Sequence, residues 1–216
     1  MAGEVKTDTA KRVALIRHGE GYHNVNSRKL YLGWLWSSAT RDTSLTATGE
    51  EQARSLQTTL QDDADHPLHK VQVVISSPLQ RALQTTRLVF GEGLTPPRCV
   101  SPLHTERCIL PCDRGRSPQE IASLFPDVKE WEGFDALEPV WWPKTRSEEF
   151  WPVDRVESFK RLLLSRSETS LAVVGHAGFF KCFAGVAMHN CEVLWVDVDS
   201  SGVRVVDCSA PLHANL

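Results

Sequence analysis

The sequence has no marked excess of either charge. Its 24 Lys and Arg residues nearly balance 27 Asp and Glu residues, so the formal net charge is -3 at pH 7 and the pI is about 6.2. Nucleic acids and anionic membranes are bound by strongly basic surfaces, which such a chain does not supply. We therefore expect no nucleic-acid or membrane partner, and any anion site must come from a local arrangement of side chains.

Closely spaced cysteine pairs and long apolar runs are also missing. The six cysteines form no CxxC pair and show no Cys/His zinc spacing, which predicts free thiols and no metal site. The most apolar stretch, 170–188, is interrupted by His176 and Lys181, and the N-terminal residues MAGEVKTDTAKR lack a signal-peptide core. These features predict a cytoplasmic protein.

What is present is an alternation of strand and helix patterns across 216 residues, without internal repeats. Short apolar runs predict strands at 13–16, 71–75, 99–103 and 170–175, and helical patterns lie at 46–61, 78–90, 117–125, 153–165 and 178–188. Segments 192–198 and 203–208 form a predicted hairpin. The pattern predicts one α/β domain over 1–216. Its sheet is mostly parallel, with helices on both faces and an antiparallel edge strand. We expect a flexible tail at 1–11 and an irregular, lid-like segment at 126–152.

Four basic side chains follow the predicted parallel strands. Arg17 and His18 end the first strand, Arg81 lies just after the second, and His176 follows the run Ala172 to Gly175. Each alone is typical of a solvated or structurally paired group. Because the carboxyl ends of parallel strands meet at one sheet edge, the four together predict a site for a dianion such as a phosphoryl group.

The motifs around these residues resemble those of the histidine phosphatase superfamily, which has the phosphoglycerate-mutase-like fold. The matching residues are Arg17-His18-Gly19, Asn24, Leu45-Thr46, Gly49, Gln52-Ala53, Ser77-Pro78, Arg81-Ala82, Gln84-Thr85, Glu106 and Gly175-His176-Ala177-Gly178. They occur in the expected order over most of the chain.

The resemblance implies a phosphohistidine mechanism that needs neither metal nor cofactor. His18 would be the nucleophile, with its other ring nitrogen fixed by a backbone carbonyl that Gly19 is placed to supply. Arg17, Arg81, His176 and Asn24 would bind the phosphoryl group, and Gly19 and Gly21 would let the substrate approach the backbone. Glu106 would protonate the leaving oxygen; its alternative is a surface glutamate paired with Arg107.

A hydrolase of a small phosphorylated metabolite is favoured over a mutase. Gly21 stands where phosphoglycerate mutases usually carry Ser or Thr, and the mutases' basic, proline-rich segment is not found. The run ERCILPCDRGRS at 106–117 instead resembles a plant and fungal branch of mutase-like phosphatases. A mutase remains the first alternative, and a catalytically silent phospho-ligand or protein-binding module is the second.

Substrate specificity is expected from the segments without family motifs, 30–43 and 126–152. They hold Trp34, Trp36, Trp131, Trp141, Trp142 and Trp151, which either stack on a substrate or only pack. Arg114, Arg116 and Lys144 either bind a second anionic group or are solvated charges. The oligomeric state stays open.

Overall fold

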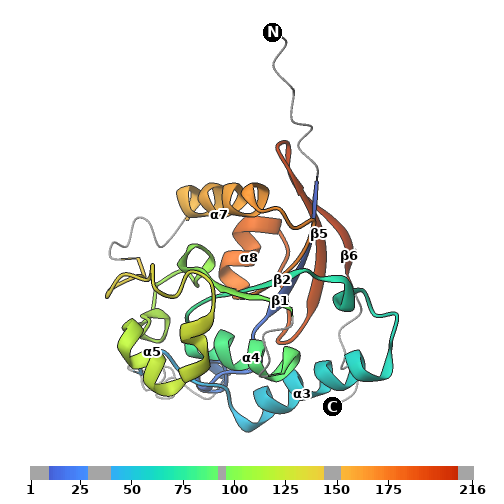
Figure 1. Cartoon of the computed structure of the whole chain (residues 1–216). Coiled ribbons are helices and arrows are strands. Elements are labelled where there is room, and N and C mark those ends of the chain that lie inside the picture. Colours follow the sequence, from blue (N-terminus) through green and yellow to red (C-terminus); the bar gives the residue numbers. More distant parts are fainter. Residues whose placement is uncertain (1–9, 29–39, 92–95, 144–151, 209–216) are drawn as a thin grey trace.

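A six-stranded mixed sheet forms the centre of the molecule. The computed structural model describes residues 10–28, 40–91, 96–143 and 152–208. The strands are β1 (Lys11–Arg17), β2 (Val73–Ser76), β3 (Arg98–Val100), β4 (Ser170–Gly175), β5 (Val193–Asp199) and β6 (Gly202–Cys208), in the order β3-β2-β4-β1-β5-β6 (Figure 1). β1 to β4 are parallel to one another, β5 runs antiparallel to β1, and β6 runs antiparallel to β5. The predicted α/β class and antiparallel edge are confirmed.

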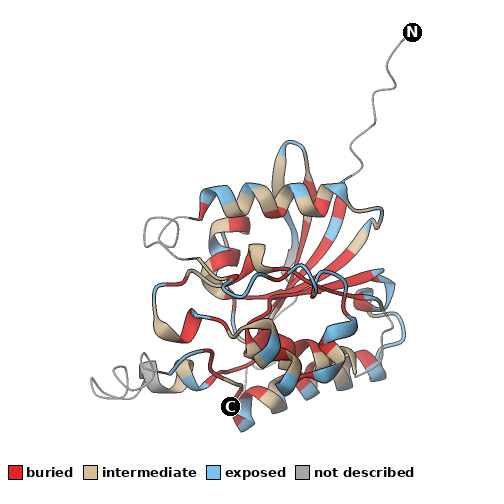
Figure 2. Ribbon diagram, turned by 60° about the vertical axis from the view of Figure 1, so that its left-hand side comes forward, coloured by how far each residue is buried: buried red, intermediate tan, exposed pale blue. Residues whose placement is uncertain are grey.

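Helices cover both faces of this sheet. They are α1 (Tyr22–Arg28), α3 (Ala47–Asp62), α4 (Gln80–Phe90), α5 (Pro118–Leu124), α7 (Val153–Ser165) and α8 (Ala177–Ala184), with 3-10 turns η1 (Pro67–Lys70), η2 (Pro102–His104), η3 (Pro111–Asp113) and η4 (Pro126–Glu130). α7 and α8 lie over one face and α3 and α4 over the other (Figure 1). The buried, red strands lie between helices whose outer sides are exposed (Figure 2).

The side chains of β1 explain the three layers. Val13 and Leu15 pack with Phe159 of α7, whereas Ala14 and Ile16 pack in the cluster that holds Leu56 of α3. All four β1 residues are fully buried, as expected of a parallel strand covered on both sides. The continuous apolar run therefore places the end of β1 in the middle of the sheet edge.

Several element boundaries differ from the sequence prediction. α4 begins at Gln80 and has Leu79 as its N-cap, so Pro78 lies ahead of the helix. α8 ends before Gly185, whose φ of 75° is left-handed, and thus stops short of residue 188. Lys11, expected in a flexible tail, is buried in β1 and donates from Nζ to the Arg166 carbonyl at 2.7 Å. Residues 1–9 lie outside the described residues.

The segment expected to be an irregular lid packs closely as far as residue 143. Trp131, Phe134 and Trp141 are buried in a third core cluster with Leu83 of α4 and Ile121 of α5. Trp141 also donates from its indole nitrogen to the Arg116 carbonyl at 2.7 Å. These two tryptophans therefore serve packing; Trp34, Trp36 and Trp151 lie outside the described residues.

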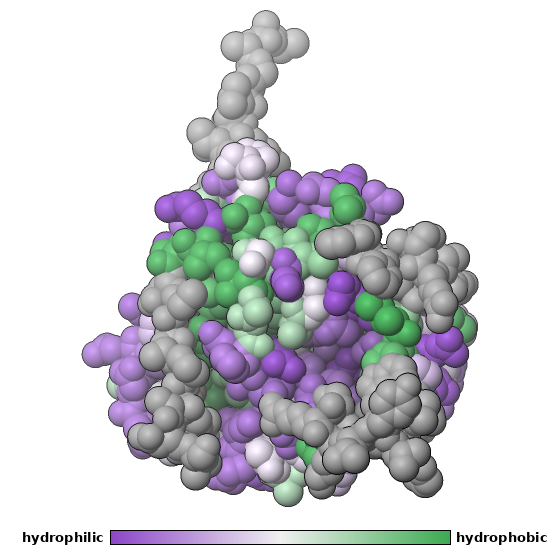
Figure 3. All heavy atoms as spheres, turned by 180° about the vertical axis from the view of Figure 1, so that it is seen from behind, coloured by the Kyte–Doolittle hydropathy of each residue, from purple (hydrophilic) through white to green (hydrophobic). Residues whose placement is uncertain are grey.

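The surface of the described residues has both hydrophilic and apolar areas. Seen from behind, it alternates between hydrophilic and apolar areas (Figure 3). Among the helices that the structure describes, we find none with the length and apolar character needed to span a bilayer.

The packing of α7 on the sheet gives a direct test of this fold. Leu163 is fully buried in the core, so we expect Leu163→Ala to lower the free energy of unfolding by about 2–5 kcal/mol. Arg161→Ala on the exposed side of α7 is the matched control and should change it by less than about 0.5 kcal/mol. Urea unfolding measures both; equal effects would contradict this arrangement.

Candidate active site

A cleft of about 430 Å³ lies at the carboxyl edge of the parallel strands. Its lining comprises Arg17, His18, His23, Asn24, Glu106, Arg107, Ile109, Leu110, Cys112 and Asp113. Arg17 is the last residue of β1 and Glu106 follows β3 by way of η2. Four predicted site residues, Arg17, His18, Asn24 and Glu106, thus line one cavity.

His18 is held in a single protonation state. The side chain is 1 % exposed, and its Nδ1 donates to the Gly19 carbonyl at 2.6 Å. A carbonyl only accepts, so the proton of the neutral ring sits on Nδ1 and Nε2 keeps its lone pair. Burial, followed by the charge of Arg81, holds the pKa of His18 well below its usual value. The ring is neutral near pH 7, which is the form that a nucleophile requires.

The loop after His18 lies against the first turn of α3. A Cβ on Gly49 would come within 2.0 Å of the Glu20 carbonyl oxygen, and one on Gly19 within 2.4 Å of the Gly49 carbonyl oxygen. Thr46 caps α3 by accepting from Gly49 N, as predicted, and its hydroxyl donates to the Glu20 carboxylate at 2.9 Å. Gln52 accepts from Glu20 N at 2.8 Å. Gly19 and Gly49 therefore allow the backbone after His18 to contact the backbone of the first turn of α3.

Gly19 and Gly21 were expected to let a ligand approach the backbone, but their amides are hydrogen-bonded within the protein. Gly19 N donates to Thr85 Oγ1 at 3.0 Å, and Gly21 N donates to Asn24 Oδ1 at 3.0 Å. Both amides are occupied by protein acceptors, and neither glycine has a positive φ. The side-chain oxygen of Asn24 is thus an acceptor within the loop, and a phosphoryl oxygen, which only accepts, requires the amide nitrogen.

The two arginines hold different positions. Arg17 lines the cleft and donates from Nη1 to the Met188 carbonyl at 2.8 Å. Arg81 is fully buried behind the cleft, where its terminal nitrogens donate to the Cys112 carbonyl at 2.9 Å and to Asp113 Oδ1 at 3.0 Å. Arg81 is therefore not among the residues that line the cleft, and it is paired with Asp113, a lining residue that the sequence analysis did not place in the site.

Asp113 belongs to η3, a short turn within the run PCD. Its Oδ2 accepts from Leu110 N at 3.2 Å while Oδ1 accepts from Arg81. Burial raises the pKa of Asp113 to about 6, although the Arg81 charge acts in the opposite direction; nearby Glu106 adds to the rise. A carboxyl that changes charge near neutral pH thus lies in the cleft wall.

His176 lies next to His18. Its ring is fully buried, with its centroid 5.1 Å from that of His18, and its Nε2 shares a hydrogen bond of 2.9 Å with Ser77 Oγ. Within the described part of the chain, its buried Nδ1 has no hydrogen-bond partner. Burial, together with Arg81, also lowers the pKa of His176 well below its usual value. The ring is neutral, and although His176 is not among the residues that line the cleft, its Nδ1 is a buried polar atom without a partner in the described residues.

Glu106 is fixed by two backbone amides. Its Oε1 accepts from Arg107 N at 2.8 Å and its Oε2 accepts from Gly178 N at 3.0 Å, in the first turn of α8. Arg155 of α7 holds the preceding backbone by donating to the Thr105 carbonyl at 2.8 Å. No ion pair with Arg107 is found among the described residues, so the geometry favours the cleft position over the surface alternative.

Two further residues of the site were missed by the sequence analysis. His23 of α1 lines the cleft with its ring centroid 5.4 Å from that of His18, and burial lowers its pKa to about 2. Asn190 donates to the His18 carbonyl at 2.9 Å. His23 could have been found from its place beside Asn24, whereas Asn190 follows α8 and carries no sequence signal.

Comparison with known proteins identifies the family. The family model described as "Histidine phosphatase superfamily (branch 1)" matches residues 13–209. The chain belongs to this superfamily. It is similar to the phosphoglycerate mutase-like protein 1 of Arabidopsis thaliana, with 31% identity over 220 residues that cover 84% of this chain and 73% of the relative.

The chain is also similar to a fungal relative in sequence and to a solved structure in fold. The protein named "Probable phosphoglycerate mutase" of Arthroderma benhamiae is 28% identical over 196 residues, which cover 81% of this chain and 57% of that protein. A mutant phosphoserine phosphatase of Entamoeba histolytica in complex with phosphoserine has a TM-score of 0.57 and 15% identity, with 95% and 100% of the two chains covered. Similarity at this identity shows the fold. The predicted resemblance to the plant and fungal branch of the superfamily is confirmed.

Three neutral histidines at this site, together with His104 in the core beneath it, predict how stability depends on pH. Burial lowers the pKa of His18, His23, His104 and His176, with His104 at about 3. The unfolded chain binds protons on these rings below pH 6.5 and the folded chain does not, so stability is lost as the pH falls. Each ring therefore lowers the free energy of unfolding at pH 5, relative to pH 7, by up to about 2 kcal/mol, since each pH unit below the unfolded pKa contributes about 1.4 kcal/mol.

Two aspartates have the opposite effect on the pH dependence of stability. Burial raises the pKa of Asp42 and Asp113 to about 6, so each takes up a proton on folding at pH 5 and restores up to about 1.4 kcal/mol. Four rings outweigh two carboxyls, and we expect urea unfolding at pH 5 to show a lower free energy than at pH 7, by up to about 5 kcal/mol. Equal or higher stability at pH 5 would contradict the neutral, buried state of these rings.

Proposed function

We propose that the protein is a phosphomonoester hydrolase for a small phosphorylated metabolite and that it acts through a phosphohistidine on His18. The observation that carries this proposal is the buried, neutral imidazole whose Nδ1 is fixed by the Gly19 carbonyl at 2.6 Å. His18 lines a cleft together with Arg17 and Glu106, and Nε2 is the ring nitrogen left with a lone pair. A nucleophile, a cation and a carboxyl group are the parts needed for phosphoryl transfer to nitrogen and then to water.

The reaction proceeds in two steps that return the enzyme to its starting state. In the first, His18 Nε2 forms a bond to phosphorus while the bond to the ester oxygen breaks, and Glu106 gives its proton to the departing alkoxide. In the second step, the oxygen of a water molecule attacks phosphorus while the Glu106 carboxylate takes a proton from that water. The nitrogen-phosphorus bond then breaks, and its electron pair returns to Nε2.

Arginine and imidazole groups supply the charge stabilisation in this scheme. Arg17 faces the phosphoryl group, and His176 Nδ1 and the Asn24 amide are the neutral donors. Protonation of Asp113 leaves the charge of Arg81 uncompensated and available to the phosphoryl oxygens. We also propose that turnover needs no metal, since fixed cations perform the charge neutralisation.

The local structure around Gly21 supports a hydrolase rather than a mutase. Gly21 offers no hydroxyl, its amide is bonded to Asn24, and a Cβ there would meet the His23 ring at 2.7 Å. A silent binding module is the other alternative, but such a module has no use for a carboxyl group placed beside a fixed imidazole. The superfamily includes phosphatases and proteins with mutase-like names, and both lie within the range of this chemistry.

The first prediction from this proposal concerns His18. The wild-type protein should release phosphate from members of a phosphomonoester panel in the presence of EDTA, and His18→Ala should lose activity by about 10⁴-fold or more because the two-step path requires its nucleophile. His69→Gln, an exposed histidine after α3, is the matched control and should retain activity.

Trapping the intermediate tests the same step independently. Enzyme quenched during turnover of a labelled substrate should carry phosphate that is labile to acid and stable to alkali, as for a nitrogen-phosphorus bond. An acid-stable, alkali-labile phosphoprotein would assign the bond to a hydroxyl, and turnover that requires an added divalent metal after EDTA treatment would overturn the metal-free scheme.

The second prediction concerns Glu106. Glu106→Gln removes the transferable proton, so kcat/KM should fall by about 10²–10⁴-fold for an alkyl phosphate, whose leaving oxygen needs protonation. The loss should be much smaller for an activated aryl phosphate. In the variant, the NH2 group of Gln would face one of the two backbone amides that donate to Glu106, which could shift the side chain. Such a shift would affect both leaving groups equally, whereas the lost proton affects mainly the alkyl phosphate. Equal losses would remove Glu106 from the acid role and direct the test to Asp113.

A further inference from the structure

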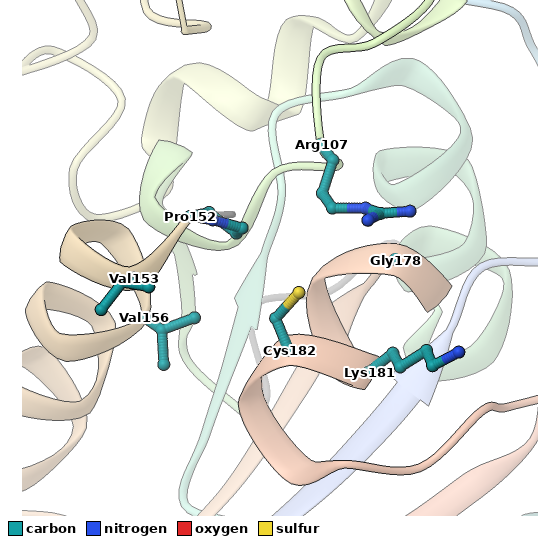
Figure 4. Close-up of a pocket in the computed structure, with 7 residues that line it drawn as sticks. All are labelled: Arg107, Pro152, Val153, Val156, Gly178, Lys181 and Cys182. Carbon is teal, nitrogen blue, oxygen red and sulfur yellow. The ribbon is translucent and has the colours of Figure 1, made fainter. Parts of the chain in front are cut away.

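A second cavity of about 420 Å³ adjoins the catalytic cleft. Its lining comprises Arg107, Pro152, Val153, Val156, Gly178, Lys181 and Cys182 (Figure 4). Arg107 lines both cavities. The two spaces are therefore neighbours that share one cationic side chain.

The start of α8 ties this cavity to the catalytic carboxyl group. Gly178 N donates to Glu106 Oε2 at 3.0 Å, and a Cβ on Gly178 would lie 2.3 Å from Glu106 Oε1 and 3.0 Å from Arg107 Nε. Glu106 and Arg107 thus both lie directly over Gly178. A leaving group whose oxygen is protonated by Glu106 would lie close to the second cavity, because Arg107 and Gly178, which both lie beside Glu106, line that cavity.

The two cations of this cavity lack the carboxylate partners that other basic residues have. Within the described residues neither Arg107 nor Lys181 forms a salt bridge, and the buried Nε of Arg107 has no hydrogen-bond partner. Arg116, an anion-binding candidate from the sequence, lies 3.5 Å from Asp42 and 3.8 Å from Glu120. The candidate Lys144 lies outside the described residues.

The opposite wall of the cavity is apolar. Pro152, Val153 and Val156 stand at the start of α7, facing Arg107 and Lys181 across Cys182 (Figure 4). Val153 is 64% exposed, which is a large exposure for an aliphatic residue at the beginning of a helix. An apolar wall facing two cations suits a ligand that has a hydrocarbon portion and an anionic group.

We propose that this cavity binds the leaving-group part of the substrate, an alcohol that carries a short apolar chain and a terminal anion. The proposal rests on the proposed hydrolase function and narrows its substrate class. The hydrocarbon part contacts Val153 and Val156, and the anion, a carboxylate or a second phosphate, is bound by Lys181 and Arg107.

The test compares three families of alkyl phosphates with two to eight carbon atoms. One ends in a methyl group, one in a carboxylate and one in a second phosphate. We expect kcat/KM to rise with chain length and the best anionic ester to exceed the uncharged ester of equal length by about tenfold. The preferred terminal group then distinguishes carboxylate from phosphate recognition. Equal values for charged and uncharged esters at every length would overturn the subsite.

Variants assign the effect to this cavity. Lys181→Gln should lower kcat/KM by about fivefold to tenfold for the anionic esters, mainly through KM, and by less than about twofold for the methyl-terminated ester. Lys129→Gln, an exposed lysine of η4, is the charge-matched control and should change neither. Equal losses for charged and uncharged esters with Lys181→Gln would also contradict the proposal.

Calorimetry separates failure of the subsite from failure of the proposed function. The same ranking of intact esters is expected for binding to His18→Ala, which requires no turnover. Discrimination in binding without hydrolysis by the wild-type protein would reject the hydrolase and keep the cavity as an anion subsite. Hydrolysis without discrimination would reject the subsite and keep the hydrolase.

Discussion

The hydrogen bond from His18 Nδ1 to the Gly19 carbonyl at 2.6 Å is the constraint on which the rest of the site depends. A neutral imidazole has two tautomers, and only one of them presents a lone pair on Nε2. The carbonyl selects that tautomer, and its own position follows from the close approach of Gly19 and Glu20 to Gly49. A methyl group on Gly19 or Gly49 would collide with backbone that cannot move aside. The first turn of α3 therefore helps to fix the tautomer of His18, the residue that follows β1.

The charges of the site follow from a second constraint, the burial of Arg81. A guanidinium with no solvent exposure needs acceptors, and the Cys112 carbonyl and Asp113 supply them. Burial is the main cause that keeps His18 neutral, and the positive charges of Arg81 and Arg17 act in the same direction. The same positive charges attract a phosphoryl dianion, so they favour both the neutral imidazole and substrate binding.

Most of the fold could be predicted because its signals are local. β4 and α7 have the predicted limits, and the capping residues Thr46 and Ser117 act as expected. The strand pattern also predicted that Arg17, His18, Arg81 and His176 meet at one edge, because the ends of parallel strands lie there, whereas Glu106 and Asn24 were expected from the family resemblance. The packing of residues 126–143 was missed because its apolar residues follow neither helical nor strand periodicity. The Arg81 ion pair with Asp113 was missed because the two are 32 residues apart and joined only by tertiary structure.

The placement of Glu106 determines where substrate selection can occur. In the proposed mechanism, the phosphoryl group occupies the cleft beside Arg17 and His18, and this group is common to all phosphomonoesters. Selection among alcohols must therefore come from residues beyond the leaving oxygen. Glu106 is held on α8 by Gly178, with Arg107 beside it and the apolar start of α7 opposite, and the tryptophans at 131 and 141 are buried in the core behind α4 and α5. Helices α7 and α8, rather than Trp131 and Trp141, are thus positioned to distinguish one alcohol from another in the proposed mechanism, because the proposed acid, Glu106, is anchored at the first turn of α8 and the start of α7 lines the adjoining cavity.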